Sequence, residues 1–349
     1  MQSEIQEMQT MGAIEQATAP SGFLSPMFLK KKPNGTFRQI FNLKVLNKYL
    51  KPKKFRLINC EKIPNFIQPK DFMMKIDISK AYFHVPIDEK HRRFLMLKFN
   101  GQLYQMTCLP FGLATAPQTF AKLTNWLANV LRNQGIRVVV YLDDFLLANQ
   151  NPITLKQQYF QAKELLCHLG WHLNQEKTSN TPSQEQEYLG VVWNTLINTK
   201  TIKNQKKEQT KKQLICIIKR SQCTWLQAKR LLGRLTFASF VVPQGRLHCR
   251  FLQRDNNHMK RYPQSIMYKL SKDTLEDCEW WLQHLSDGSP IHLQPTTVFI
   301  TTDASDIGWG ASINGQNLSG TWNAKQQKWH CNRKELWTVL IALRKKIAL

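Results

Sequence analysis

The first 200 residues alternate short apolar runs with turn-forming residues, a pattern that is typical of strands and hairpins. Pro33-Asn34-Gly35 and Asn100-Gly101 each separate two such runs, so both are predicted to be hairpin turns. The run Val138–Leu147 is apolar on both sides of an Asp-Asp pair, which predicts a strand, a tight turn and a strand. The other expected strands are 28–29, 37–41, 72–77, 94–99, 102–106, 298–304 and 308–313.

Apolar residues recur at helical spacing in other parts of the chain. After Pro117 they continue as far as Gly135, a residue type that commonly follows a helix. The expected helical regions are 3–15, 117–135, 213–251, 275–285 and 333–349. The basic stretch 203–212 predicts a domain boundary, and the polar stretch 286–294 predicts a linker.

The charge of the chain is its most unusual bulk property. Its 349 residues suffice for two or three domains, and 42% apolar residues are ordinary for a globular protein. However, 49 Lys and Arg against 24 Asp and Glu leave a formal net charge of +25, so much of the surface must carry positive potential. A nucleic-acid backbone is the favoured partner, because neutralised phosphates release counterions. A merely solubilising basic surface is the alternative.

The eight cysteines contain no Cys-x-x-Cys pair, which argues against a zinc ribbon and a disulfide framework. This favours a reducing compartment, and we expect an intracellular protein of the cytoplasm or nucleus. The polar, acidic amino-terminal residues do not resemble a signal peptide. The longest uncharged stretch, Asn100–Ala121, contains prolines and polar residues, so we expect neither a membrane span nor a membrane partner.

Candidate chemistry comes from three carboxylates at the ends of apolar runs. Asp143 and Asp144 lie inside VVVYLDDFLLA, and Asp77 ends the run FMMKID. Adjacent buried carboxylates are costly unless a cation compensates, and oxygen ligands suit Mg²⁺, with Mn²⁺ as a substitute. Three such acids could hold two metal ions about 4 Å apart, the arrangement that activates a 3′-hydroxyl and stabilises a leaving pyrophosphate. An isolated Asp-Asp pair would be equally compatible with a solvated acidic turn.

The stretches around these acids resemble the motifs of reverse transcriptases. FMMKIDISKAYFHVPI is similar to motif A, LPFGLATAPQTF to motif B, and YLDD to motif C. GWHLNQEKT and EYLGVVW resemble motif D and the primer grip, and GAIEQATAPSGFLSPMFLKKKPNGTFRQIFNLKVLN resembles the fingers segment. The order and spacing match across residues 12–195. In wording, the motifs are most similar to DIRS-like, tyrosine-recombinase retrotransposons, with gypsy-type retrotransposons next.

The resemblance implies an RNA-directed and DNA-directed DNA polymerase that extends the primer of a template-primer with deoxynucleoside triphosphates. Asp77 and Asp143 would be the catalytic metal ligands, and Asp144 a weaker ligand or support. Lys177 would be the motif D lysine that protonates pyrophosphate. The residues implied to bind the nucleotide are Lys32 and Arg38 at the triphosphate, Tyr82 excluding a ribose 2′-hydroxyl, and Phe111 and Gly112 beneath the nascent pair.

Two positions depart from common patterns of the family. Asn42 stands where many reverse transcriptases have Asp, and Phe111 stands where lentiviral enzymes have Gln. As structural alternatives, Tyr82 could be a core aromatic residue, and Lys32, Arg38 and Lys177 could be solvated surface charges.

The carboxy-terminal residues bear a second resemblance. TTDASDIGWGASI and NRKELWTVLIAL are similar to the opening strands and first helix of ribonuclease H, in which a strand Asp and a helix Glu bind metal. Here these would be Asp303 and Glu335. The family uses further carboxylates on later elements, so the resemblance implies a partial domain that is inactive alone.

The sequence therefore predicts an α+β fold: a right-hand polymerase with fingers, a palm containing an antiparallel sheet and a helical thumb, followed by a partial ribonuclease H-like α/β domain. No oligomeric state is predicted. The alternative functions are a non-catalytic nucleic-acid-binding remnant of a retroelement and, less favoured, a metal-dependent nuclease. The expected parts are a helical lead (1–20), fingers and palm (21–198), thumb or connection (199–290) and the ribonuclease H-like segment (296–349).

Overall fold

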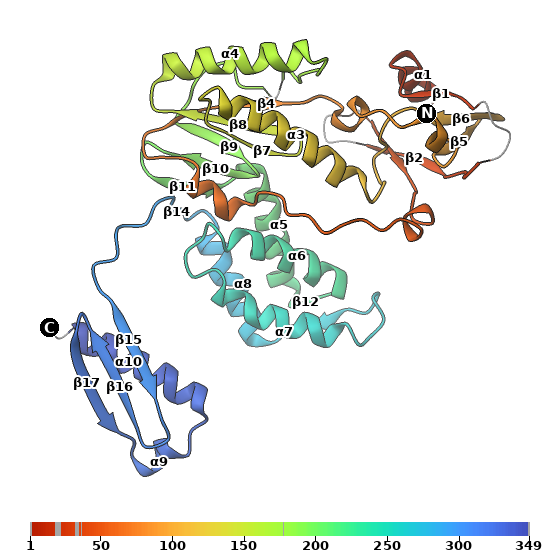
Figure 1. Cartoon of the computed structure of the whole chain (residues 1–349). Helices are drawn as coiled ribbons and strands as arrows, with labels where there is room; N and C mark the ends of the chain where they lie inside the picture. Colours follow the sequence, from red (N-terminus) through yellow and green to blue (C-terminus); the bar gives the residue numbers. More distant parts are fainter. Residues whose placement is uncertain (1, 18–21, 32–34, 36, 177, 348–349) are drawn as a thin grey trace. The chain divides into compact units, whose positions relative to one another are not determined.

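The computed structural model describes residues 2–17, 22–31, 35, 37–176 and 178–347. It divides into two compact units, residues 1–292 and 293–349, which are treated separately below (Figure 1). Within the described residues, no helix is both long and apolar enough to span a membrane.

The amino-terminal part of the first unit contains two small antiparallel sheets, with strand orders β1-β6-β5 and β2-β3. Helix α1 ends at Thr10, so the prediction of a helix over 3–15 is wrong beyond that residue. Gly12 takes a φ of +65°, and Ile14 then pairs with Met106. The predicted turn residues Pro33 and Asn34 lie outside the described residues. The elements are α1 (Gln2–Thr10), β1 (Ile14–Gln16), β2 (Met27–Lys31), β3 (Phe37–Phe41), α2 (Glu89–Arg92), β5 (Met96–Phe99) and β6 (Gln102–Met106).

A second three-stranded antiparallel sheet, in the order β4-β8-β7, lies at the centre of the first unit. Its elements are β4 (Phe72–Asp77), α3 (Ala116–Asn133), β7 (Val138–Tyr141), β8 (Asp144–Asn149) and α4 (Pro152–His168). Helix α4 begins after Asn151, whose side chain accepts hydrogen bonds from the backbone N–H groups of Ile153 and Thr154. These elements agree with the sequence prediction within a few residues at their ends.

Both faces of this central sheet are buried, which explains why its strands read as continuous apolar runs rather than as alternating ones. On one face, Ile76 and Phe145 pack with residues of α3 and α4. On the other face, Met73 and Leu146 belong to a second core that includes Trp193. A carboxylate at the end of such a strand therefore stands beside two hydrophobic cores.

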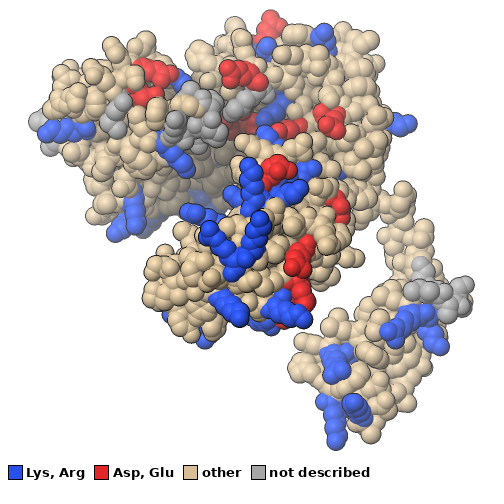
Figure 2. All heavy atoms as spheres, turned by 180° about the vertical axis from the view of Figure 1, so that it is seen from behind, with Lys and Arg blue, Asp and Glu red and all other residues tan. Residues whose placement is uncertain are grey.

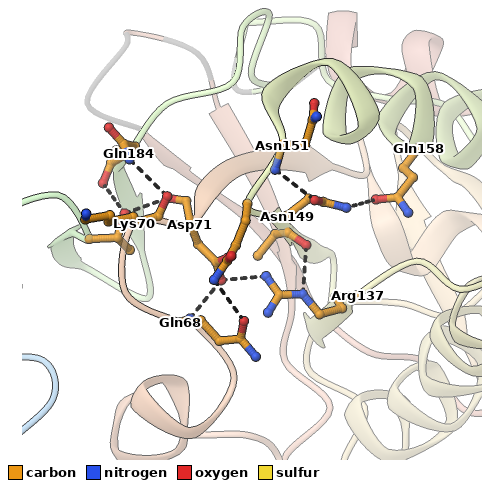
Figure 3. A network of polar contacts seen from close by, with 11 residues as sticks. Gln68, Lys70, Asp71, Arg137, Asn149, Asn151, Gln158 and Gln184 are labelled. Carbon is orange, nitrogen blue, oxygen red and sulfur yellow. Dashed lines mark hydrogen bonds and ion pairs between the residues drawn. The ribbon is translucent and has the colours of Figure 1, made fainter.

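A buried ion pair ties the three strands together at the end opposite the carboxylates (Figure 3). Asp71, which precedes β4, is fully buried, and its Oδ2 lies 2.5 Å from Nη2 of Arg137. The same oxygen accepts a hydrogen bond from the backbone N–H of Gln68. Arg137 precedes β7 and donates from Nε to the carbonyl of Ala148 in β8 at 3.2 Å. One side chain therefore links all three strands.

The rest of the first unit is a four-stranded antiparallel sheet, in the order β14-β11-β10-β9, with a group of helices. Helix α6 begins with a capping box between Thr224 and Gln227. The short strands β12 and β13 pair with each other. The elements are β9 (Glu185–Tyr188), β10 (Val191–Asn194), β11 (Thr199–Ile202), α5 (Asn204–Arg220), β12 (Gln222–Cys223), α6 (Trp225–Ala238), α7 (Arg250–Met259), β13 (Tyr268–Lys269), α8 (Lys272–His284) and β14 (Ser289–Pro290).

Two expectations about connections are corrected here. Residues 203–212 are not a connection but the beginning of α5, and Leu214 of this helix shares one core with Trp193 of β10. The basic residues that suggested a boundary lie on the exposed side of an amphipathic helix. Within the predicted linker 286–294, Ser289 and Pro290 pair with β11 and so belong to the sheet.

The second unit, residues 293–349, contains an antiparallel three-stranded sheet in the order β15-β16-β17 with helix α10 packed against β15 and β16. Its small core includes Ala311, Ile313 and Ala342. The sequence predicted the first hairpin and the helix but not β17, whose pattern is mostly polar. The elements are β15 (Ile300–Ala304), β16 (Gly308–Ile313), β17 (Gln316–Thr321), α9 (Ala324–Gln327) and α10 (Cys331–Ile347).

Candidate active site

The register of the central sheet brings the predicted carboxylates to one edge. Asp77 at the end of β4 lies directly opposite Asp144 at the start of β8. Asp143 occupies the two-residue turn between β7 and β8, because Tyr141 pairs with Asp144. The backbone N–H of Ile78 donates to the carbonyl of Asp143 at 3.0 Å. Two acids 66 positions apart in the sequence are thereby joined through adjacent backbone.

The turn that carries Asp143 has an unusual backbone. Leu142 has a φ of +53°, in the left-handed region that a side chain with a Cβ rarely adopts outside Gly, Asn and Asp. Such a conformation costs on the order of 1–2 kcal/mol and persists only where the surrounding structure enforces it. Here the sheet pairing on both sides of the turn enforces it.

Asp77 is only 4% exposed, and the segment after residue 173 holds its backbone. The N–H of Asn174 donates to the Asp77 carbonyl at 2.8 Å, and the N–H of Asp77 donates to Oγ1 of Thr178 at 3.3 Å. The predicted motif D residue, Lys177, lies between these two contacts in sequence but outside the described residues. The structure therefore places the motif D segment beside Asp77.

Asp144 is bound differently from the other two acids. Its Oδ1 lies 2.9 Å from Nζ of Lys75, a residue that points to the same face of β4 as Asp77. Its backbone carbonyl accepts a hydrogen bond from the hydroxyl of Tyr188 at 3.0 Å. Burial, with the negative charge of Asp144 adding to it, raises the pKa of Tyr188 above its ordinary value, so this phenol remains a neutral donor. Sequence analysis missed both Lys75 and Tyr188, although each lies inside a motif that it had recognised.

The donor set was tested for its fit to divalent metal. Among the described residues, no three His, Cys, Asp or Glu side chains come together as a metal cluster, and Asp144 is engaged by Lys75. Asp77 and Asp143 still fit Mg²⁺, because Mg²⁺ prefers oxygen and in nucleotide enzymes is held by one or two carboxylates together with substrate phosphates. The assignment of all three acids as ligands stays a prediction.

Tyr82 stands beside these acids in a cluster of aromatic rings. Its ring centroid lies 4.8 Å from that of Phe111 and 5.3 Å from that of Phe120, which it meets edge-on. Burial raises the pKa of Tyr82 above its ordinary value, and the negative charge of Asp143 raises it further. The electrostatic effect shows that the phenol lies close to the predicted metal site.

Gly112 follows Phe111 and has no room for a side chain. Its φ is +106°, and a Cβ at this position would lie 2.8 Å from the backbone oxygen of Phe41. Asn47 holds the same turn, because its Nδ2 donates to the carbonyl of Gly112 and its Oδ1 accepts from the N–H of Ala114. Asn47 was not predicted as a site residue. Its type gave no signal, since its role depends on a loop 65 positions away.

The two predicted triphosphate-binding residues are described only in part. Lys32 lies outside the described residues. The backbone of Arg38 belongs to β3 and pairs with that of Lys30 in β2. Their roles stay predictions.

The comparison with protein families agrees with this geometry. The family model described as "Reverse transcriptase (RNA-dependent DNA polymerase)" matches residues 29–193, which include Asp77, Tyr82 and the Asp143-Asp144 pair. Residues 29–193 form a reverse transcriptase domain.

Relatives of this reverse transcriptase domain occur in long polyproteins. The enzymatic polyprotein of cauliflower mosaic virus (strain CM-1841) is 23% identical over 98% of this chain and 50% of the viral protein. The transposon Tf2-3 polyprotein of Schizosaccharomyces pombe is 25% identical over 53% of this chain and 14% of that protein. The chain thus spans about half the length of the viral polyproteins and a smaller share of the transposon polyprotein.

Solved structures show the fold around the reverse transcriptase domain. A foamy viral protease-reverse transcriptase in complex with double-stranded DNA matches with a TM-score of 0.71 at 17% identity, over 100% of this chain and 60% of that chain. The foamy viral protein in complex with an RNA/DNA hybrid matches with a TM-score of 0.68 at 18% identity, over 99% of this chain and 46% of that chain. The predicted right-hand polymerase fold is confirmed.

The second unit carries the other predicted acids. Asp303 lies in β15 and is exposed, whereas Glu335 lies in the first turns of α10. Next to Glu335, the ammonium group of Lys334 is buried and donates to Oδ1 of Asp306 at 2.7 Å. This hydrogen bond holds the pKa of the Asp306 carboxyl below its ordinary value. Asp306 is therefore already paired within its own unit.

Proposed function

We propose that this chain extends a primer with deoxynucleotides, using an RNA or a DNA template, by two-metal nucleotidyl transfer. One observation carries the proposal. Asp77 lies opposite Asp144 across β4 and β8, and Asp143 is joined to the next residue of β4's chain by a backbone hydrogen bond. Carboxylates grouped at one edge of a doubly buried sheet have little structural use, because each loses hydration there.

In this proposal, Asp77 and Asp143 hold divalent metal, with Mg²⁺ as the natural ion and Mn²⁺ as a substitute. When bound, two ions would supply activation of the primer 3′-hydroxyl and stabilisation of the leaving pyrophosphate. Asp144 then supports the site rather than binding metal directly, since Lys75 already neutralises it. Lys177 is proposed as the group that protonates the pyrophosphate.

The nucleotide is proposed to lie over Tyr82, Phe111 and Gly112. The packing of Tyr82 against Phe111 holds the phenol ring in place, which would let it exclude a ribose 2′-hydroxyl by steric contact. The absence of a Cβ at Gly112 would let backbone and ligand approach closely. Lys32 and Arg38 are proposed to bind the triphosphate, with Arg38 able to donate two parallel hydrogen bonds.

Template-primer is the proposed macromolecular partner. Lys and Arg side chains gather on one face of the first unit (Figure 2). Arg246 and Arg250 line a cavity of about 560 Å³ that also borders Glu61, and Lys229, Arg230 and Arg234 are exposed on α6. Residues 199–290 would thus act as a thumb that contacts the duplex backbone. The foamy viral neighbours, which were solved with double-stranded DNA and with an RNA/DNA hybrid, support this reading.

Origin and tail remain proposals of the same kind. The wording of the motifs supports a DIRS-like retrotransposon, and the eight free cysteines are compatible with the reducing interior of the cell. For residues 296–349 we propose a ribonuclease H-like segment that does not cut RNA by itself. Its three carboxylates are Asp303, Asp306 and Glu335, and Lys334 already binds Asp306.

The test is primer extension by the purified chain on RNA and DNA templates, with and without Mg²⁺. We expect extension on both templates that requires the ion and is lost in Asp143→Asn and in Asp77→Asn. Binding of the duplex should remain close to that of the parent, because neither change removes a phosphate-contacting cation. Extension within about tenfold of the parent by either variant would contradict the assignment.

A further inference from the structure

The outer side of helix α3 forms a groove with an extended segment that precedes β4. The residues that line this groove are Phe55, Arg56, Gln118, Ala121, Lys122, Asn125, Trp126 and Asn129. Its volume is about 330 Å³, within the range of roughly 300–1,000 Å³ that is typical of small-ligand sites. The opposite side of α3 is fully engaged, because Phe120, Leu127 and Leu131 pack in the core of the central sheet. The groove is therefore separate from the carboxylate site.

Two aromatic rings are exposed in this groove. The side chain of Trp126 is 57% exposed and that of Phe55 is 40% exposed. In the described part of the chain, neither ring stacks on another aromatic residue or lies under a cation. Each indole or benzene face of this kind leaves a large apolar area in water, which is costly unless a partner covers it.

The charge around the rings identifies the kind of partner. Residues 51–59 (KPKKFRLIN) and α3 contain no Asp or Glu. They contribute six cations: Lys51, Lys53, Lys54, Arg56, Lys122 and Arg132. Among the described residues, neither Arg56 nor Lys122 forms an ion pair. A polyanion that also carries flat apolar faces would satisfy both the rings and the charges.

We infer that the groove between residues 51–59 and α3 binds unpaired nucleotides of a single-stranded nucleic acid. Bases would stack on Trp126 and Phe55, and phosphates would lie against Arg56 and Lys122, the combination used by single-strand-binding surfaces. The amide side chains of Gln118 and Asn129 could meet base edges, which only an unpaired base exposes fully. Paired bases cannot stack on a protein ring without leaving the duplex, so blunt duplex would gain nothing from these two rings.

This inference rests on the proposed function for its natural ligand, the unpaired part of a template, but it makes a separate claim about binding. The probes are a fluorescent twelve-nucleotide single strand and a blunt duplex, each titrated with the full chain in the absence of nucleotide. The decisive variant is Phe55→Ala with Trp126→Ala. Phe160→Ala is the matched control, since Phe160 is 53% exposed on α4 and distant in sequence from the groove.

We expect the double variant to bind the single strand about tenfold more weakly for each ring removed, and the blunt duplex within twofold of the parent. Replacing Arg56 and Lys122 by Gln should instead reduce the salt dependence of single-strand binding by one to two phosphate contacts. Because the removed side chains are exposed, the variants should keep the parent's circular dichroism spectrum. Trp126→Phe, which retains a ring, should recover most of the single-strand affinity.

Unchanged single-strand affinity in the double variant would overturn the inference, and so would equal losses for single strand and blunt duplex. The two proposals fail independently. If the parent extends no primer yet binds single strands through these rings, the proposed function fails and the groove assignment stands. If extension occurs and single-strand binding ignores the rings, only the groove assignment fails.

Discussion

Nζ of Lys75 lies 2.9 Å from Oδ1 of Asp144, one strand away from Asp77 in the same sheet. Both side chains are largely buried, with 17% and 24% of their surfaces exposed. The pair divides the three acids into one that already has a cation and two, Asp77 and Asp143, that are placed to share a metal. A site with two such carboxylates is sufficient for Mg²⁺ that also binds substrate phosphates.

Lys75→Met should therefore strengthen metal binding. The change leaves Asp144 charged, and an extra negative charge a few ångströms from the ion favours binding by about 1 kcal/mol or more, or at least about fivefold in Kd. The measurement is a Mn²⁺ titration followed by electron paramagnetic resonance, without nucleic acid. Lys98→Met, at an exposed position of β5, serves as the control. Unchanged or weaker Mn²⁺ binding in Lys75→Met would show that Asp144 is not held in reserve by Lys75.

Tyr82→Ala should admit ribonucleotides. The ring packs on Phe111 and Phe120, so its removal opens space beside the proposed sugar position without displacing the acids. The quantity to compare is the ratio of kcat/KM for deoxynucleotide and ribonucleotide incorporation in variant and parent. We expect the ratio to fall by at least about tenfold. A ratio that does not change would make Tyr82 a core aromatic residue with no part in sugar selection.

Gly112→Ala should destabilise the fold by about 2 kcal/mol or more, because it combines a left-handed backbone with a Cβ placed 2.8 Å from the carbonyl oxygen of Phe41. Gly101→Ala is the matched control. Gly101 has a φ of +82°, but its new Cβ would meet no atom within 4 Å, so only the backbone term of about 1 kcal/mol applies. Urea unfolding of the two variants measures the difference. Equal costs would mean that the loop around Gly112 moves freely away from β3.

Binding of template-primer should weaken steeply with salt and depend little on sequence. The net charge of +25 and the exposed arginines of the helical region favour contacts to phosphates rather than to bases. Fluorescence anisotropy between about 50 and 200 mM salt should show a loss of at least about a hundredfold. A dissociation constant that stays flat over this range would argue against a backbone-contacting surface.

The purified chain should cut the RNA of an RNA–DNA hybrid no faster than its Asp303→Asn variant. Two-metal hydrolysis needs several carboxylates around one site, and in residues 293–349 Lys334 withdraws Asp306 from the three that exist. The assay is the release of labelled RNA fragments at equal protein concentration. Hybrid-specific cleavage that disappears in Asp303→Asn would show that Asp303 works in an active nuclease site.

Local pattern was sufficient to predict most elements of this protein and the edge at which its acids meet. The runs 72–77 and 138–147 are strands because they are short, apolar and bounded by turns, and the acids at their ends stand out because buried carboxylates are costly. The predicted helix was too long at residues 3–15, because Ile14–Gln16 gains its partner only from β6, some 90 positions later. The basic beginning of α5 looked like a boundary because one side of an amphipathic helix reads as a charged stretch.

Only the tertiary structure decided which side chains share a space. Nothing in the spacing of Lys75 and Asp144 predicts an ion pair, since it depends on the register between β4 and β8. The same holds for Asn47 at Gly112 and for Trp126 beside Phe55, where a helix and an irregular segment meet. A sequence reports which residues prefer to be buried, charged or turned. Contacts between distant positions are set by the packing of all the elements together, and in this protein those contacts distinguish the neutralised acid from the two that can hold metal.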